Sequence, residues 1–108
     1  MRYLMMSKTS DSTPDEQLYA EMGRFIQEMT AAGVLLATGG LNPGVGTRVV
    51  ANGSEITVTD GPFAEAKESV AGFALIEVAT KEEAIEMARR FLGIVGDGES
   101  VVQEVFGP

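Results

Sequence analysis

The sequence predicts an α+β fold of the ferredoxin-like sandwich type, in which two helices cover one face of a four-stranded antiparallel sheet. Two observations predict the helices: apolar residues recur at helical spacing in two segments, and a capping signal precedes each segment. A third observation predicts the sheet, because four short apolar runs have the length of strands. The predicted order is β-α-β, an inserted β-hairpin, then β-α-β. The 108 residues are enough for one core, so residues 1–108 are expected to form a single domain.

Each predicted helix begins at a capping box. In Thr13-Pro14-Asp15-Glu16 we expect Thr13 to be the N-cap, Pro14 to occupy the first helical position and Glu16 to reach back to the cap. Thr80-Lys81-Glu82-Glu83 follows the same pattern. We expect Gly33 to end the first helix in the left-handed conformation. The predicted buried faces are Leu18, Met22, Phe25, Ile26 and Met29 in the first helix, and Ala84, Ile85, Ala88, Phe91 and Leu92 in the second, which a loop over Gly93–Gly98 follows.

The predicted strands of the main sheet are Tyr3–Met6, Val34–Ala37, Ala71–Val78 and Val101–Phe106. Three runs within them are apolar throughout: Tyr3–Met6, Phe73–Ile76 and Val101–Val102. An antiparallel sheet with one solvated face should alternate polar and apolar residues, and these runs alternate little. The two helices can cover only one face, so a second copy of the chain is expected to cover the other. We therefore expect an obligate homodimer that buries more than about 1,000 Å².

The inserted hairpin follows a Gly-rich loop that spans Gly39 to Gly46. Two strand-like runs flank Asn52-Gly53, a dipeptide typical of two-residue hairpin turns. Such a turn would place Val49 opposite Ile56 and Arg48 opposite Thr57. The hairpin is expected to be half exposed, with one face made of Thr47, Val49, Ala51, Ile56 and Val58, and the other of Arg48, Glu55, Thr57 and Thr59.

Composition excludes several functions. The chain has no cysteine and no histidine, so thiol nucleophiles, imidazole bases and ordinary zinc sites are ruled out. A magnesium or calcium site made only of carboxylates is the remaining alternative, but no acidic loop has the ligand spacing for it, and we expect no metal and no cofactor. The net charge of −8 disfavours nucleic-acid and membrane surfaces, because both attract clustered lysines and arginines. The Gly-rich loop lacks the spacing of a phosphate-binding motif. With no signal peptide or membrane span evident, we expect a cytoplasmic protein.

The candidate site is the segment Asp60-Gly61-Pro62-Phe63. Asp60 could simply shape a turn, with Gly61 and Pro62 setting the backbone and Phe63 anchoring it in the core. The same rigid turn could instead hold the Asp60 carboxylate at the rim of a cleft between subunits. Partial desolvation there would suit it to general acid–base chemistry.

Two cations belong to the same hypothesis. Lys67 is either a surface or ion-pair residue or a ligand for an anionic substrate group. Arg48 either pairs diagonally with Glu55 or binds a ligand. The substrate-binding set of the functional hypothesis is therefore Gly61, Phe63, Lys67 and Arg48, with Asp60 as the catalytic carboxylate.

The segment DGPFAEAKE, followed by Ala71-Gly72-Phe73, resembles the signature of the YCII-related proteins and specifically of their DGPF-domain branch. Ala32–Leu35 and Gly40–Pro43 also resemble that branch. The resemblance implies a ferredoxin-like fold that pairs into a dimeric α/β barrel, with a site near Asp60. Better-studied relatives are thought to use a His–Asp pair, which this chain lacks. It also has Ala66 and Phe73 where the branch usually carries a threonine and a tyrosine.

Two functions fit these observations. The first is a homodimer that binds or transforms a small molecule in a cleft near Asp60, by carboxylate acid–base chemistry if it is an enzyme. The second is a non-catalytic regulatory module that binds a protein partner in transcription, because the resemblance implies a link to sigma factors. The substrate and the reaction do not follow from the sequence.

Overall fold

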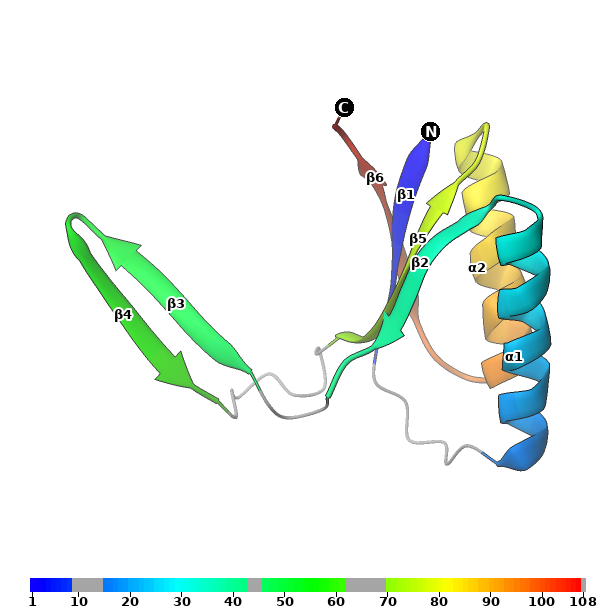
Figure 1. Cartoon of the computed structure of the whole chain (residues 1–108), viewed down its shortest axis with the longest axis horizontal. Coiled ribbons are helices and arrows are strands. Elements are labelled where there is room, and N and C mark those ends of the chain that lie inside the picture. Colours follow the sequence, from blue (N-terminus) through cyan, green and yellow to red (C-terminus); the bar gives the residue numbers. More distant parts are fainter. Residues whose placement is uncertain (9–14, 43–45, 62–69, 108) are drawn as a thin grey trace.

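A computed structural model describes residues 1–8, 15–42, 46–61 and 70–107 of the chain. Its main sheet has the strand order β2-β5-β1-β6, and all neighbouring strands are antiparallel. Both helices lie on one face of this sheet, as predicted (Figure 1). The elements are β1 (Arg2–Lys8), α1 (Glu16–Ala31), β2 (Leu35–Gly40), β3 (Thr47–Asn52), β4 (Glu55–Asp60), β5 (Val70–Glu77), α2 (Lys81–Val95) and β6 (Ser100–Val105).

Helix α1 begins later than predicted. Asp15, and not Thr13, is the N-cap: its backbone is extended and its Oδ1 accepts a hydrogen bond from the Leu18 N–H at 2.8 Å. Aspartate is as good a cap as threonine, and Thr13 and Asp15 are only two residues apart in the sequence. Thr13 and Pro14 lie outside the described residues. The apolar face is as predicted, but its five members are only half-buried.

The end of α1 confirms the glycine cap. Gly33 has a φ of 77°, its N–H donates to the Thr30 carbonyl at 3.1 Å, and the Val34 N–H donates to the Met29 carbonyl at 2.9 Å. These two bonds form a Schellman motif, which requires a left-handed residue at this position.

Replacing Gly33 by Ala is therefore expected to lower the free energy of unfolding by about 1 kcal/mol, because a Cβ is unfavourable in the left-handed region. Gly23→Ala is the matched control: Gly23 lies inside α1, and a Cβ there would meet nothing within 4 Å. That change should stabilise the helix by about 0.5–1 kcal/mol. Urea unfolding measures both, and shifts of the same sign would contradict the assignment.

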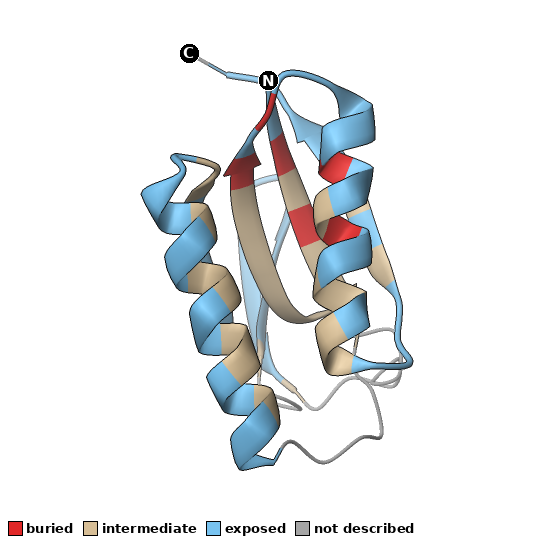
Figure 2. Cartoon of the chain, turned by 90° about the vertical axis from the view of Figure 1, so that its right-hand side faces the viewer, coloured by how far each residue is buried: buried red, intermediate tan, exposed pale blue. Residues whose placement is uncertain are grey.

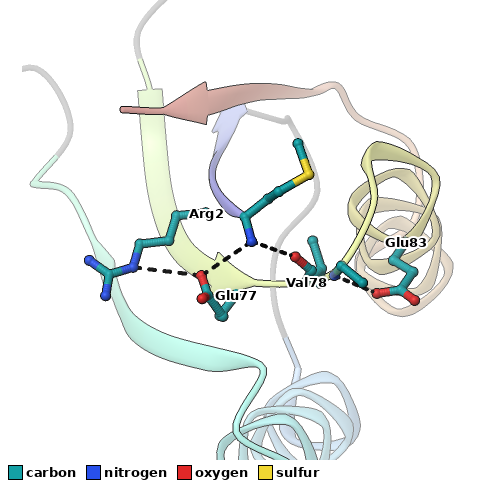
Figure 3. A network of polar contacts seen from close by, with 6 residues as sticks. Arg2, Glu77, Val78 and Glu83 are labelled. Atoms are coloured by element: carbon teal, nitrogen blue, oxygen red, sulfur yellow. Dashed lines mark hydrogen bonds and ion pairs between the residues drawn. The ribbon is translucent and has the colours of Figure 1, made fainter. Parts of the chain in front are cut away.

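Helix α2 has the predicted cap. The Thr80 side chain accepts from the Glu83 N–H at 3.2 Å, as predicted. The Glu83 carboxylate accepts from the Ala79 N–H at 2.9 Å, one residue before the cap N–H that a capping box would use (Figure 3). Ala84 and Ala88 are buried as predicted, but Ile85 is 37% exposed and does not belong to the buried face.

The end of α2 also differs from the prediction. The helix continues through Gly93, which was expected to begin a loop, and ends at Val95 before Gly96 (φ 88°). Ile94 and Val95 are half-buried, and their packing outweighs the cost of one helical glycine.

The core lies between the sheet and α2 (Figure 2). Tyr3 and Met5 of β1 face Ile76 and Ala74 of β5 across the ladder. The six buried apolar residues are Tyr3, Met5, Ile76, Val78, Ala84 and Ala88. Burial, together with the carboxylates of Glu104 and Glu82, raises the pKa of the Tyr3 phenol.

The N-terminus is tied to the end of β5. The Met1 amino group donates to the Val78 carbonyl at 2.8 Å and lies 3.8 Å from the Glu77 carboxylate (Figure 3). Arg2 Nε lies 3.6 Å from the same carboxylate. These contacts join the first residues of the chain to the strand beside them.

Strand β2 runs further than predicted, because Gly39 and Gly40 pair with Phe73 and Gly72 of β5. They were expected in a loop. A Cβ at Gly39 would lie 3.0 Å from the Phe73 ring, so any other residue in this position would require the ring to shift.

The β3–β4 hairpin has a different turn from the one predicted. Asn52 pairs with Glu55, so the turn residues are Gly53 and Ser54. Gly53 has a φ of 64°, and no described residue other than glycine has a positive φ. An Asn-Gly type I′ turn needs two positive φ values, whereas a type II′ turn needs glycine at its first central position.

The true register places Val49 opposite Val58 and Arg48 opposite Thr59. The predicted pairs are therefore wrong by two residues, which leaves each residue on its predicted face. The exposure is also wrong: every strand residue of the hairpin is exposed, on both faces.

The face of the main sheet that carries no helix has an apolar centre, although Arg2, Glu77 and Gln103 also lie on it. Leu4 lies opposite Leu75, and Met6 lies between Phe73 and Val101. Leu4, Met6, Phe73 and Leu75 are half-buried, and Val101 and Val105 are exposed. We call these six residues the helix-free face. Strands that are apolar on both sides were predicted, and the structure has them.

Candidate functional site

Asp60 is the last residue of β4 and closes the base of the hairpin. Its Oδ1 accepts a hydrogen bond from the Thr47 hydroxyl at 2.8 Å, and the next residue, Gly61, donates its N–H to the Gly46 carbonyl at 2.7 Å. Thr47 and Asp60 are exposed cross-strand partners. Within one chain, the carboxylate therefore joins the two ends of the hairpin.

The other predicted site residues are only partly placed. Phe63 and Lys67 lie outside the described residues. Arg48 is exposed and faces the opposite side of the hairpin from Asp60, because neighbouring residues of a strand alternate. Its predicted diagonal pairing with Glu55 is wrong, since Glu55 lies opposite Asn52 at the other end of the hairpin.

A pocket of about 360 Å³ lies elsewhere, between the two helices and the sheet. Methionines and aromatic rings form much of its wall: Met5, Met22, Met29, Met87, Phe25 and Phe91. Asp60 does not line this pocket. The Asp60 segment and the pocket are therefore two separate places in the single chain.

The pocket exists because α1 packs loosely. No residue of α1 is buried, and the floor beneath it is formed by the small residues Gly72 and Ala74 of β5. Arg90 of α2 spans to α1, where its guanidinium lies 5.0 Å from the Phe25 ring centroid and 3.4 Å from Glu28. These contacts hold the helices together above the space. The sequence predicts the apolar stripe of α1 as a buried face, whereas in the structure four of its residues line the pocket.

Polar groups gather at one end of the pocket. Ser7 and Lys8 come from the end of β1, and Asp97 and Glu99 come from the loop after α2. The pocket opens to the surface, so solvent or a small molecule can enter it. Pockets of this size and lining are typical of sites for small apolar molecules.

Among the described residues, no three acidic side chains are grouped so as to hold a metal ion. None of the described helices is both long enough and apolar enough to cross a bilayer.

The fold defines the chain as an α+β protein with a four-stranded antiparallel sheet, two helices on one face and an inserted hairpin. The model of the YCII-related domain matches residues 1–92, and the chain belongs to this family.

Two known proteins are similar to the chain. An uncharacterised protein of Rhizobium meliloti is 34% identical over 76 residues, which cover 69% of this chain and 61% of that protein. The chain thus spans less than two thirds of its relative's length. The solved structure of 5-chloro-2-hydroxyhydroquinone dehydrochlorinase (TftG) from Burkholderia phenoliruptrix, in complex with 2,5-dihydroxybenzoquinone, superposes with a TM-score of 0.57 and 14% identity. That match covers all of this chain and 96% of the other, and it shows a shared fold.

Proposed function

We propose that the chain acts as a homodimer of the DGPF-domain branch, in which the helix-free faces pack together as a dimeric α/β barrel and a small molecule binds in the cleft beside Asp60. One observation carries this proposal. The helix-free face is a contiguous apolar surface on strands whose other side already bears both helices. Exposed apolar patches of this kind mark interaction surfaces.

The fold comparison supports a class of ligand for this proposal. The structurally similar dehydrochlorinase was solved with 2,5-dihydroxybenzoquinone, a small planar ring with oxygen substituents. A cleft with apolar walls and one carboxylate suits such a ring, because apolar surface binds its faces and Asp60 contacts its polar edge. Gly61, Phe63 and Lys67 are the proposed binding residues around that carboxylate. Arg48 is not among them, because it lies on the other face of the hairpin. Asp60 would move a proton to or from a ring oxygen.

Asp60→Asn tests this role with little effect on the fold. Asparagine keeps an oxygen that can accept the Thr47 hydroxyl hydrogen bond, so the melting temperature should change little. Affinity for 2,5-dihydroxybenzoquinone, measured by calorimetry, should fall by about tenfold, corresponding to 1.4 kcal/mol. Thr47→Val is the control, because it removes the hydrogen bond and keeps the carboxylate. Equal affinities in the wild type and Asp60→Asn would contradict the role.

A non-catalytic role is the second candidate. The observation that favours it is the hydrogen bond from Thr47, which gives Asp60 a structural task at the hairpin base. The protein would then act by binding a regulatory partner. Affinity purification from the native host should recover that partner, and recovery of the homodimer alone would count against this function.

A further inference from the structure

The β3–β4 hairpin extends away from the rest of the molecule (Figure 1). Its strands pair with each other in a sheet of their own, and all twelve strand residues are exposed. The radius of gyration is 15.9 Å, whereas a compact domain of this length has about 13 Å. An isolated two-stranded ribbon is marginally stable in water. This hairpin therefore needs a surface on which to pack.

The two faces of the hairpin differ. One carries Val49, Ala51, Ile56 and Val58, with Thr47 and Asp60 at its base. We call this the aliphatic face; Val49, Ile56 and Val58 are 63%, 69% and 64% exposed on it. The other face carries Arg48, Glu55, Thr57 and Thr59, with Val50 as its large aliphatic residue. Burial against a protein surface is thus favourable for one side of the hairpin only.

We propose that the hairpin is an arm that packs its aliphatic face on the partner subunit, at the edge of that subunit's helix-free face. This inference rests on the proposed dimer. The occupant is a second copy because the aliphatic face would extend the same apolar interface, and two-fold symmetry would form the contact twice. The net charge of −8 opposes self-association except through surfaces with few carboxylates. The aliphatic face has Asp60 as its single charged residue.

The arm has a consequence for the site. Asp60 shares a face with Val49 and Val58, so packing that face on the partner turns the carboxylate toward the subunit boundary. Each cleft would then take Asp60 from one chain and its apolar wall from the other. A single chain holds an incomplete site, which accounts for the exposure of Asp60 and for its separation from the pocket between the helices.

The chain lacks cysteine, so single engineered thiols can test the contact cleanly. Val58→Cys on the arm is mixed with a size-tagged Val101→Cys on β6, the edge strand of the helix-free face. Subunits are then exchanged, and a short bismaleimide is added. The expected product is a covalent heterodimer. Thr57→Cys, on the other face of the same strand, is the matched control and should crosslink far less.

A second pair of variants measures the same contact without crosslinking. Val58→Glu should weaken the dimer by about tenfold or more, because a carboxylate would be buried without a partner, whereas Thr57→Glu should leave the dimer dissociation constant unchanged. If the wild type is a dimer, but the arm does not crosslink and Val58→Glu and Thr57→Glu have equal dimer dissociation constants, the arm is wrong and the proposed function still stands. A wild-type monomer in sedimentation velocity at micromolar concentration would overturn both.

Discussion

Leu75→Asp is expected to convert the proposed dimer into a folded monomer. Leu75 lies in the middle of β5 on the helix-free face, opposite Leu4, and its neighbours there are apolar. In the dimer, an aspartate at this position would be a buried charge with no partner, at a cost of about 3–5 kcal/mol. Two-fold symmetry introduces it twice. Such a cost would raise the dissociation constant by more than about a thousandfold, which sedimentation velocity at micromolar concentration would detect.

The control for this prediction is Ile85→Asp. It makes the same change of charge and nearly the same change of size, at a side chain of α2 that is 37% exposed. This variant should remain a dimer, and circular dichroism should show that both variants stay folded. If both variants lose the dimer, added negative charge alone separates the subunits. If Leu75→Asp remains a dimer, the helix-free faces do not form the dimer interface.

The sequence predicted the elements whose signals are local. The Thr80 cap, the Gly33 cap and the apolar stripe of α1 depend on residues within one or two helical turns, so spacing alone was sufficient. Strands that are apolar on both faces were equally evident. The predicted N-cap of α1 was wrong because two good caps, Thr13 and Asp15, compete over the same turn.

Features that depend on distant partners were not predictable in this way. Gly39 and Gly40 look like loop residues until Phe73 and Gly72 are placed beside them. The hairpin turn shifted because Asn52 has no positive φ, which the Asn-Gly signal assumed. Both differences arise from pairing, which the local sequence does not encode.

The candidate site was predictable to a similar degree. The motif located Asp60 and Gly61, but its hydrogen-bond partner Thr47 follows only from the strand register. The pocket between the helices was missed because its wall has the same composition as a core. Its presence depends on how closely α1 approaches the small residues of β5, and helical spacing contains no information on that distance.

Ile76→Ala is expected to be the most destabilising conservative change in the main sheet. Ile76 follows Leu75 on β5 but points to the other side, where it packs at the centre of the core opposite Tyr3 and Leu35. Its side chain is 3% exposed. Truncation to alanine removes buried methyl groups and leaves a cavity, which costs about 2–5 kcal/mol. Urea unfolding should therefore show a much lower midpoint.

The comparison with Ile85→Ala makes this prediction specific to position. The chemical change is identical, but Ile85 is 37% exposed and lies in a helix, where alanine is the better residue. Its free energy of unfolding should change by less than about 1 kcal/mol. Measuring both changes in the Leu75→Asp monomer removes the contribution of dimerisation, which would otherwise make the midpoint depend on protein concentration. Equal losses at the two isoleucines would mean that Ile85 is packed as tightly as Ile76, which would contradict the difference in their exposure.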